Sequence, residues 1–128
     1  MAVADLTSSN SITTGNDSIV IIKNLGDIPG GRTLDVTGFT PDVIKAGHLI
    51  IRDTVGGEYK PNPISGTDFA ALPANHEYVG VLVSSIQKSR PFAAIMDRGD
   101  VLEPAMPYGS VPAGAKTALN LIKFKTAQ

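Results

Sequence analysis

Three short apolar runs, each containing or flanked by glycine, dominate the pattern of this 128-residue chain. They span residues 43–53, 78–83 and 92–101. Apolar runs of about four to eight residues bounded by turn residues are typical of β-strands, because helices of globular domains usually need about ten or more. Turn-forming residues gather between the runs, as at Pro29-Gly30-Gly31 and Pro61-Asn62-Pro63. The sequence therefore predicts a mainly β fold, a small β-clip or barrel-like domain with little helix.

Local patterns assign individual elements. Val55-Gly56-Gly57-Glu58 is typical of a hairpin turn, and the prolines that follow Lys60 end the second strand of that hairpin. Residues 78–86 and 92–97 are expected to form two strands of another hairpin. The expected core residues in the first run are Ile44, Leu49, Ile50 and Ile51.

The remaining segments are less regular. A helical turn is predicted at 68–72, and the prolines and glycines of 103–114 predict an extended loop. The apolar spacing at positions 115, 118, 119 and 122 fits a helix, whereas Leu121–Phe124 fits a closing strand equally well.

The chain length fits one domain preceded by a tail. Residues 1–22 are interpreted as an N-terminal arm, since most of them are small and polar, and residues 23–128 as a single β-rich domain. Ile12 and the run Ile19–Ile22 would let this arm add a strand to a partner sheet.

Composition excludes several function classes. The chain has 11 basic and 12 acidic residues with mixed signs, so it lacks the basic patch that a nucleic acid would require. Its lack of cysteine excludes disulfides and thiol chemistry. No stretch approaches the roughly 18 apolar residues of a membrane span, so no membrane partner is expected.

No residues form a recognisable catalytic or metal-binding motif, and we expect neither enzymatic activity nor a cofactor. His48 and His76 are interpreted as surface histidines because no third ligand is placed beside them. Asp97, Asp100 and Glu103 are interpreted as a solvated strand end, with a turn at Gly99.

Five segments, taken in order, resemble a known family. They are Ile44-Lys45-Ala46-Gly47-His48-Leu49-Ile50, Tyr59-Lys60-Pro61, Gly80-Val81-Leu82, Ala93-Ala94-Ile95-Met96-Asp97-Arg98-Gly99-Asp100-Val101 and Leu119-Asn120-Leu121-Ile122-Lys123-Phe124. Their order and spacing are similar to those of the head decoration proteins of lambda-type tailed bacteriophages, which are auxiliary capsid proteins that stabilise the shell. The similarity covers residues 42–124.

The resemblance implies a clip-like β fold, a homotrimer and a structural role on the outer surface of the virion capsid. The implied partners are the major capsid protein and two further copies of the chain, and the trimer would bridge neighbouring shell subunits. The residues implied in the capsid-contacting arm are Ile12, Ile19, Val20, Ile21 and Ile22. The residues implied in a trimer or shell contact loop are Met106, Pro107 and Tyr108.

Other functions remain open at this point. The strand around Ala46-Gly47 also resembles the first strand of antifreeze-like (SAF-type) domains, which would imply a small carbohydrate- or ligand-binding module. Another surface component of a phage virion and a small β-barrel enzyme are the further alternatives.

Overall fold

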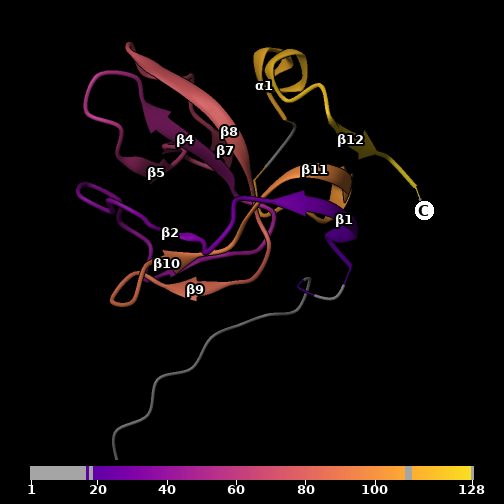
Figure 1. Cartoon of the computed structure of the whole chain (residues 1–128), viewed down its shortest axis with the longest axis horizontal. Helices are drawn as coiled ribbons and strands as arrows, with labels where there is room; N and C mark the ends of the chain where they lie inside the picture. The colour runs from indigo at the N-terminus through magenta and orange to yellow at the C-terminus, as the bar shows by residue number, and fades with distance from the viewer. Residues whose placement is uncertain (1–16, 18, 109–110, 128) are drawn as a thin grey trace, which may run out of the picture.

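A computed structural model describes residues 17, 19–108 and 111–127, which fold into short strands with little helix (Figure 1). The first seven strands are β1 (Ile21–Asp27), β2 (Arg32–Thr33), β3 (Val43–Ile44), β4 (Leu49–Asp53), β5 (Tyr59–Pro61), β6 (Ile64–Ser65) and β7 (Asp68–Phe69). The later elements are β8 (His76–Leu82), β9 (Ile86–Gln87), β10 (Phe92–Ala93), β11 (Ile95–Leu102), the 3-10 helix η1 (Glu103–Ala105), α1 (Ala113–Ala118) and β12 (Ile122–Lys125). The prediction of a mainly β fold is confirmed.

One six-stranded sheet organises the domain, in the order β1-β11-β8-β4-β5, with β12 paired to β11. Every pairing in it is antiparallel except the parallel pairing of β12 with β11. Three two-stranded ladders, β10-β2, β3-β9 and β6-β7, complete the described strands. In Figure 1, β2, β9 and β10 lie on one side of the molecule, and α1 and β12 lie on the other.

The two predicted hairpin pairings are present. β4 and β5 pair antiparallel around the turn at Gly56-Gly57, where Gly57 has a φ of 82°. β8 pairs with β11 through Leu82 opposite Ile95 and Val81 opposite Met96, so the second and third apolar runs are neighbours, as expected. The short strands β9 and β10 occupy the connection between them.

The core contains two clusters of buried side chains, one on each side of the central strands. Ile44 and Ile50 belong to one cluster and Leu49 to the other, and all three have no exposed surface. Ile51 is 1% exposed, so all four predicted core residues of the first run are confirmed. Full burial of an aliphatic side chain of this size contributes about 1.5–3 kcal/mol, which makes β4 the strand that anchors the fold.

Two local predictions are corrected. The extended loop expected over residues 103–114 contains η1 at its start and the first residues of α1 at its end. Residues 68–72 do not form a helical turn, because Asp68 and Phe69 form β7 and pair with β6, and this places Phe69 in the core. The alternatives at the C-terminal end are both partly right, since α1 is followed by β12. None of the described helices is long and apolar enough to cross a membrane.

Gly99 lies inside β11, where a turn was expected. Its φ is 150°, and a Cβ at this position would contact the carbonyl oxygen of Lys23 in β1. β1 follows β11 with register shifts around this point. The glycine therefore allows the two strands to approach closely where the ladder is irregular.

Candidate functional site

The run Ile19–Ile22, expected in the arm, lies on the domain. Ile19 is 41% exposed, but Val20 has no exposed surface and its carbonyl oxygen accepts a hydrogen bond from Leu102 N at 2.8 Å. Ile21 and Ile22 begin β1 and are half-buried. The boundary predicted after residue 22 is therefore wrong, because a buried side chain and a paired strand hold this run to the core.

The domain extends one step further toward the N-terminus. The Asp17 carboxylate accepts hydrogen bonds from Ser85 N at 2.8 Å and from Ser85 Oγ at 2.6 Å. Ser85 Oγ in turn accepts a hydrogen bond from Ala46 N at 3.0 Å. Ile12, the other residue predicted in the arm, lies outside the described residues.

The predicted contact loop contains one core residue and two half-buried ones. Met106 follows η1 and is 7% exposed, so its side chain packs inside the domain and not toward a partner. Pro107 and Tyr108 are half-buried and present part of their surface to solvent. Only these last two residues offer area for the predicted trimer or shell contact.

The loop and the run around Val20 meet at Gly47. A Cβ at Gly47 would lie 2.5 Å from Val20 Cγ2, 3.3 Å from Pro107 Cδ and 3.5 Å from Met106 Cγ. Gly47 has a φ of 89°, a conformation that glycine adopts readily and other residues rarely do. The segment around Val20 and the loop at Met106–Pro107 are therefore packed on one glycine of the first apolar run.

His48 is fully buried, so its interpretation as a surface histidine is wrong. Its Nε2 donates a hydrogen bond to the carbonyl oxygen of Asn62 at 2.8 Å, and Phe69 and Tyr108 pack on the ring edge to face. Burial lowers the pKa of the imidazole from 6.5 to about 4, against the opposing effect of the bond to Asn62. At neutral pH the ring is therefore uncharged.

Asn62 is the second fully buried polar side chain. Its Nδ2 donates to the carbonyl oxygens of Pro63 at 2.8 Å and Ala70 at 3.1 Å, so it joins β5 to the β6–β7 hairpin. The flanking prolines predict a turn at Asn62 and give no indication that its side chain is buried. The apolar neighbours of His48 on both sides were the available signal that the imidazole is inside.

His76, the other histidine, is half-buried, and its Nδ1 donates to the carbonyl oxygen of Ala74 at 2.8 Å. Asp100 forms an ion pair with Lys125 at 3.4 Å, and Glu103 forms one with Lys116 at 3.1 Å. Asp97 is exposed. Among the described residues, no three His, Asp or Glu side chains form a group that could hold a metal ion.

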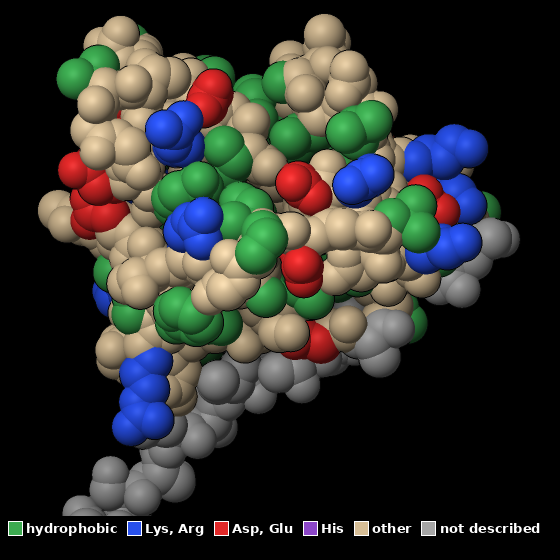
Figure 2. All heavy atoms as spheres, in the orientation of Figure 1, with side chains coloured by type: hydrophobic (Ala, Val, Ile, Leu, Met, Phe, Trp, Pro, Cys, Tyr) green, Lys and Arg blue, Asp and Glu red, His purple; other side chains and the backbone are tan. Residues whose placement is uncertain are grey.

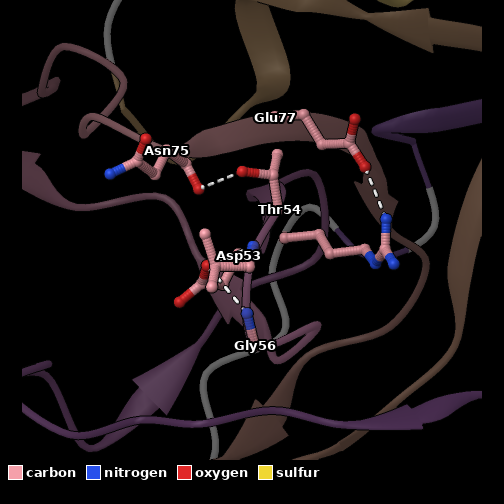
Figure 3. Close-up of polar contacts among 7 residues, drawn as sticks. Asp53, Thr54, Gly56, Asn75 and Glu77 are labelled. Atoms are coloured by element: carbon pink, nitrogen blue, oxygen red, sulfur yellow. Dashed lines mark hydrogen bonds and ion pairs between the residues drawn. The ribbon is translucent and has the colours of Figure 1, made fainter.

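The turn between β4 and β5 is held by polar contacts to the loop that precedes β8 (Figure 3). The Asp53 carboxylate accepts hydrogen bonds from Val55 N at 2.8 Å and Gly56 N at 3.2 Å, and these bonds lower the pKa of its carboxyl. Thr54 Oγ1 donates to Asn75 O at 3.0 Å. These interactions fix the turn.

A half-open pocket of about 260 Å³ lies between the loop after β2 and the β4–β5 hairpin. Its apolar lining comes from Phe39, Ile51, Pro61, Pro63 and Pro73. Its polar lining comes from Asp35, Thr37, Lys60 and His76. Figure 2 shows hydrophobic side chains on this face with charged ones among them, over the region where Figure 1 places β2 and β5.

Several large hydrophobic side chains are exposed away from this pocket. Leu25 in β1 is 56% exposed and Leu121, just before β12, is 64% exposed. Both flank Gly99, since Asn24 and Ile122 are its partners in the two neighbouring strands. Phe92 is 61% exposed on β10.

Comparison of the chain with protein-family models, with curated proteins and with solved structures gave no match.

Proposed function

We propose that this chain is a structural protein of a phage virion, which binds the outer surface of the capsid as a homotrimer and bridges neighbouring major capsid subunits. The proposal rests on the resemblance of residues 42–124 to the lambda-type head decoration proteins. The observation that supports it best is where the resembling segments lie. Each of the five segments contributes residues to one of β4, β5, β8, β11 and β12, which belong to one sheet, while Ile44 lies in β3 and Ala93 in β10.

The glycines of these segments have structural explanations that fit a shared fold. A Cβ at Gly80 would contact the carbonyl oxygen of Met96 in β11, and a Cβ at Gly99 would contact that of Lys23 in β1. The glycines shared with the family pattern therefore lie where two strands approach closely. Because only glycine fits such positions, proteins that share the fold would be expected to share these glycines.

A bridging function needs contact area and not reactive groups. The exposed side chains of Leu25, Phe92 and Leu121, together with Pro107 and Tyr108, supply apolar area around the sheet. Three copies joined in a trimer would bind multivalently, and avidity of this kind exceeds single-site affinity by about 10²–10⁴. Weak individual contacts are then sufficient to hold a shell together.

Sedimentation equilibrium of the purified chain, followed by co-sedimentation with expanded lambda-type capsids that lack their own decoration protein, tests this proposal. We expect a trimer that pellets with the capsids and raises the temperature at which they release their DNA. A chain that stays monomeric and remains in the supernatant would contradict the proposal.

A small ligand-binding module is the second candidate, and the pocket beside Phe39 favours it. The pocket is slightly smaller than the roughly 300–1,000 Å³ typical of drug-sized ligand sites, so it would hold one sugar ring or one side chain. Its lining combines apolar side chains with the carboxylate of Asp35 and the ammonium of Lys60, which suits a ligand that carries both hydrogen-bond donors and acceptors.

Titration of the ¹⁵N-labelled chain with a panel of methyl glycosides tests the second candidate. Binding would shift the amide resonances of Ile51 and Lys60 in a saturable manner, and Thr37→Trp, at an exposed position of the lining, would abolish the shifts by filling the pocket. The absence of shifts at millimolar glycoside would reject a monosaccharide site.

A further inference from the structure

His48 and Asn62 form a small polar centre inside the apolar core. The carbonyl oxygen of Asn62 only accepts hydrogen bonds, so Nε2 of His48 carries the proton and Nδ1 is the unprotonated nitrogen. Nδ1 of His48 and Oδ1 of Asn62 have no hydrogen-bond partner among the described residues. The imidazole thus has one free basic nitrogen in a fully buried position.

Among the described residues, no negatively charged group packs against this nitrogen to stabilise a protonated imidazole. Phe39, Phe69 and Tyr108 pack against the ring edge to face, with ring centroids 5.4, 5.1 and 5.5 Å away. Phe39 lies in the loop after β2, Phe69 in β7 and Tyr108 in the segment after η1, while Asn62 directly follows β5. The titratable group among them is the Tyr108 phenol, whose pKa is raised by burial, so it stays neutral in acid.

The backbone of His48 cannot move away to reach water. Leu82 N donates to the carbonyl oxygen of His48 at 2.9 Å, and Gly47 N donates to the carbonyl oxygen of Leu82 at 2.8 Å. The residues that follow belong to β4, which is paired on both sides. A protonated imidazole can therefore reach water only if one of the segments that cover the ring moves away.

The segment Met106–Tyr108 covers the ring without belonging to a strand. Among the described residues, the hydrogen bonds beside it run to Glu103, from Met106 N at 3.0 Å to the backbone and from Val111 N at 3.2 Å to the side chain. Phe69 lies in a paired strand, and the carbonyl oxygen of Phe39 accepts a hydrogen bond from Lys88 Nζ at 3.1 Å. Lifting Met106–Tyr108 breaks no strand pairing, whereas displacing Phe69 would break the β6–β7 ladder and displacing Phe39 would release Lys88.

We propose that His48 is an acid-sensitive latch, which keeps the segment Met106–Tyr108 closed over the core while neutral and releases it when Nδ1 takes up a proton. Release exposes the imidazole to water and removes Met106 and Pro107 from their contact position beside Gly47 and Val20. Because burial holds the pKa of His48 at about 4, the latch is closed at neutral pH. This inference rests on the packing alone and not on the proposed capsid function.

Methyl and imidazole NMR of the full chain across pH 7 to 3 tests the latch. Labelled methionine supplies Met106 as the probe of the segment and Met96, which has no exposed surface in the central sheet, as the probe of the core. We expect the Met106 methyl and the His48 ring to shift with one midpoint, while the Met96 methyl keeps its folded position. Simultaneous loss of both methyl signals would overturn the proposal, because the event would be global unfolding.

Two variants sharpen the test. His48→Phe keeps an aromatic ring in the cage but cannot take up a proton, so the Met106 shift should disappear. His76→Gln is the matched control and should leave the Met106 midpoint unchanged. If His48 titrates in the wild-type chain while Met106 stays in place, the latch is refuted even if His48→Phe fails to fold.

Discussion

Gly99→Ala should be among the most destabilising single-methyl changes in this chain. Gly99 has a φ of 150° in the middle of β11, where residues with a Cβ are strained by about 1–3 kcal/mol. The new methyl group would also contact the carbonyl oxygen of Lys23, and it would lie 2.8 Å from Met96 Sδ and 3.2 Å from Leu25 N. Two of these three atoms are backbone, so β1 must shift as a whole.

The magnitude follows from adding two terms. Overpacking of this kind typically costs about 1–3 kcal/mol, and the backbone strain adds a similar amount. We therefore expect a loss of about 2–6 kcal/mol, which is a large part of the 5–15 kcal/mol that is roughly typical of a whole domain. With a urea m-value of about 2 kcal/mol/M, the unfolding midpoint should fall by about 1–3 M.

Urea unfolding followed by circular dichroism measures this loss, and Gly114→Ala is the matched control. Gly114 is exposed in α1, and a Cβ there would have no atom within 4 Å. Alanine is favoured over glycine inside a helix by about 0.5–1 kcal/mol, so this variant should be slightly more stable than the wild type. A Gly99→Ala midpoint equal to that of the wild type would refute the reasoning about β1 and β11.

Three further predictions follow from buried groups. The pKa of His48 is about 4 in the folded chain and 6.5 in the unfolded one, so protonation favours the unfolded chain as the pH falls from 6.5 toward 4. The free energy of unfolding should therefore decrease by about 3 kcal/mol over this range. The loss is measurable as a drop in the urea midpoint, which His48→Phe should not show. Asn62→Ala leaves the carbonyl oxygens of Pro63 and Ala70 without their donor and should lower the free energy of unfolding by about 2–4 kcal/mol in the same assay. The control Asn24→Ala removes an exposed hydrogen bond and should lower it by less than about 1 kcal/mol. Removal of residues 1–22 deletes, beyond what removal of 1–16 deletes, Asp17, Val20 and the start of β1. It should therefore give a melting temperature at least about 5 °C below that of the shorter truncation, and equal melting temperatures of the two would contradict the packing of this run on the domain.

The fold class and the main strands could be predicted from the sequence because they follow from local signals. Gly56-Gly57 is typical of a hairpin turn. The apolar run at 49–51 predicts a buried strand. The same signals do not specify where a segment packs in three dimensions. Phe69 was assigned to a helical turn because its pairing with Ile64 becomes favourable only once β6 and β7 cover the core.

The errors in the candidate site have the same physical origin. The run Ile19–Ile22 was interpreted as part of an arm because polar residues precede it, but the edge of β11 gives it a partner that lies some eighty residues away in the sequence. His48 was interpreted as exposed because no third metal ligand stands beside it in the sequence, whereas Phe39, Phe69 and Tyr108 enclose it from three distant parts of the chain. Apart from the apolar neighbours of His48, long-range packing of this kind leaves no local pattern.

The residues that carry the family resemblance and the residues available to a partner are largely different sets. Ala46, Val81, Leu82 and Val101 are buried, and Gly80 and Gly99 are positions of close strand approach. These features report on how the chain folds. The exposed apolar side chains that a partner would contact, such as Leu25 and Phe92, lie on β1 and β10. If the chain binds a capsid as we propose, its partner is selected mainly by residues outside those that determine the fold, so polar substitutions at Leu25 and Phe92 should weaken co-sedimentation with capsids while the circular dichroism spectrum stays unchanged.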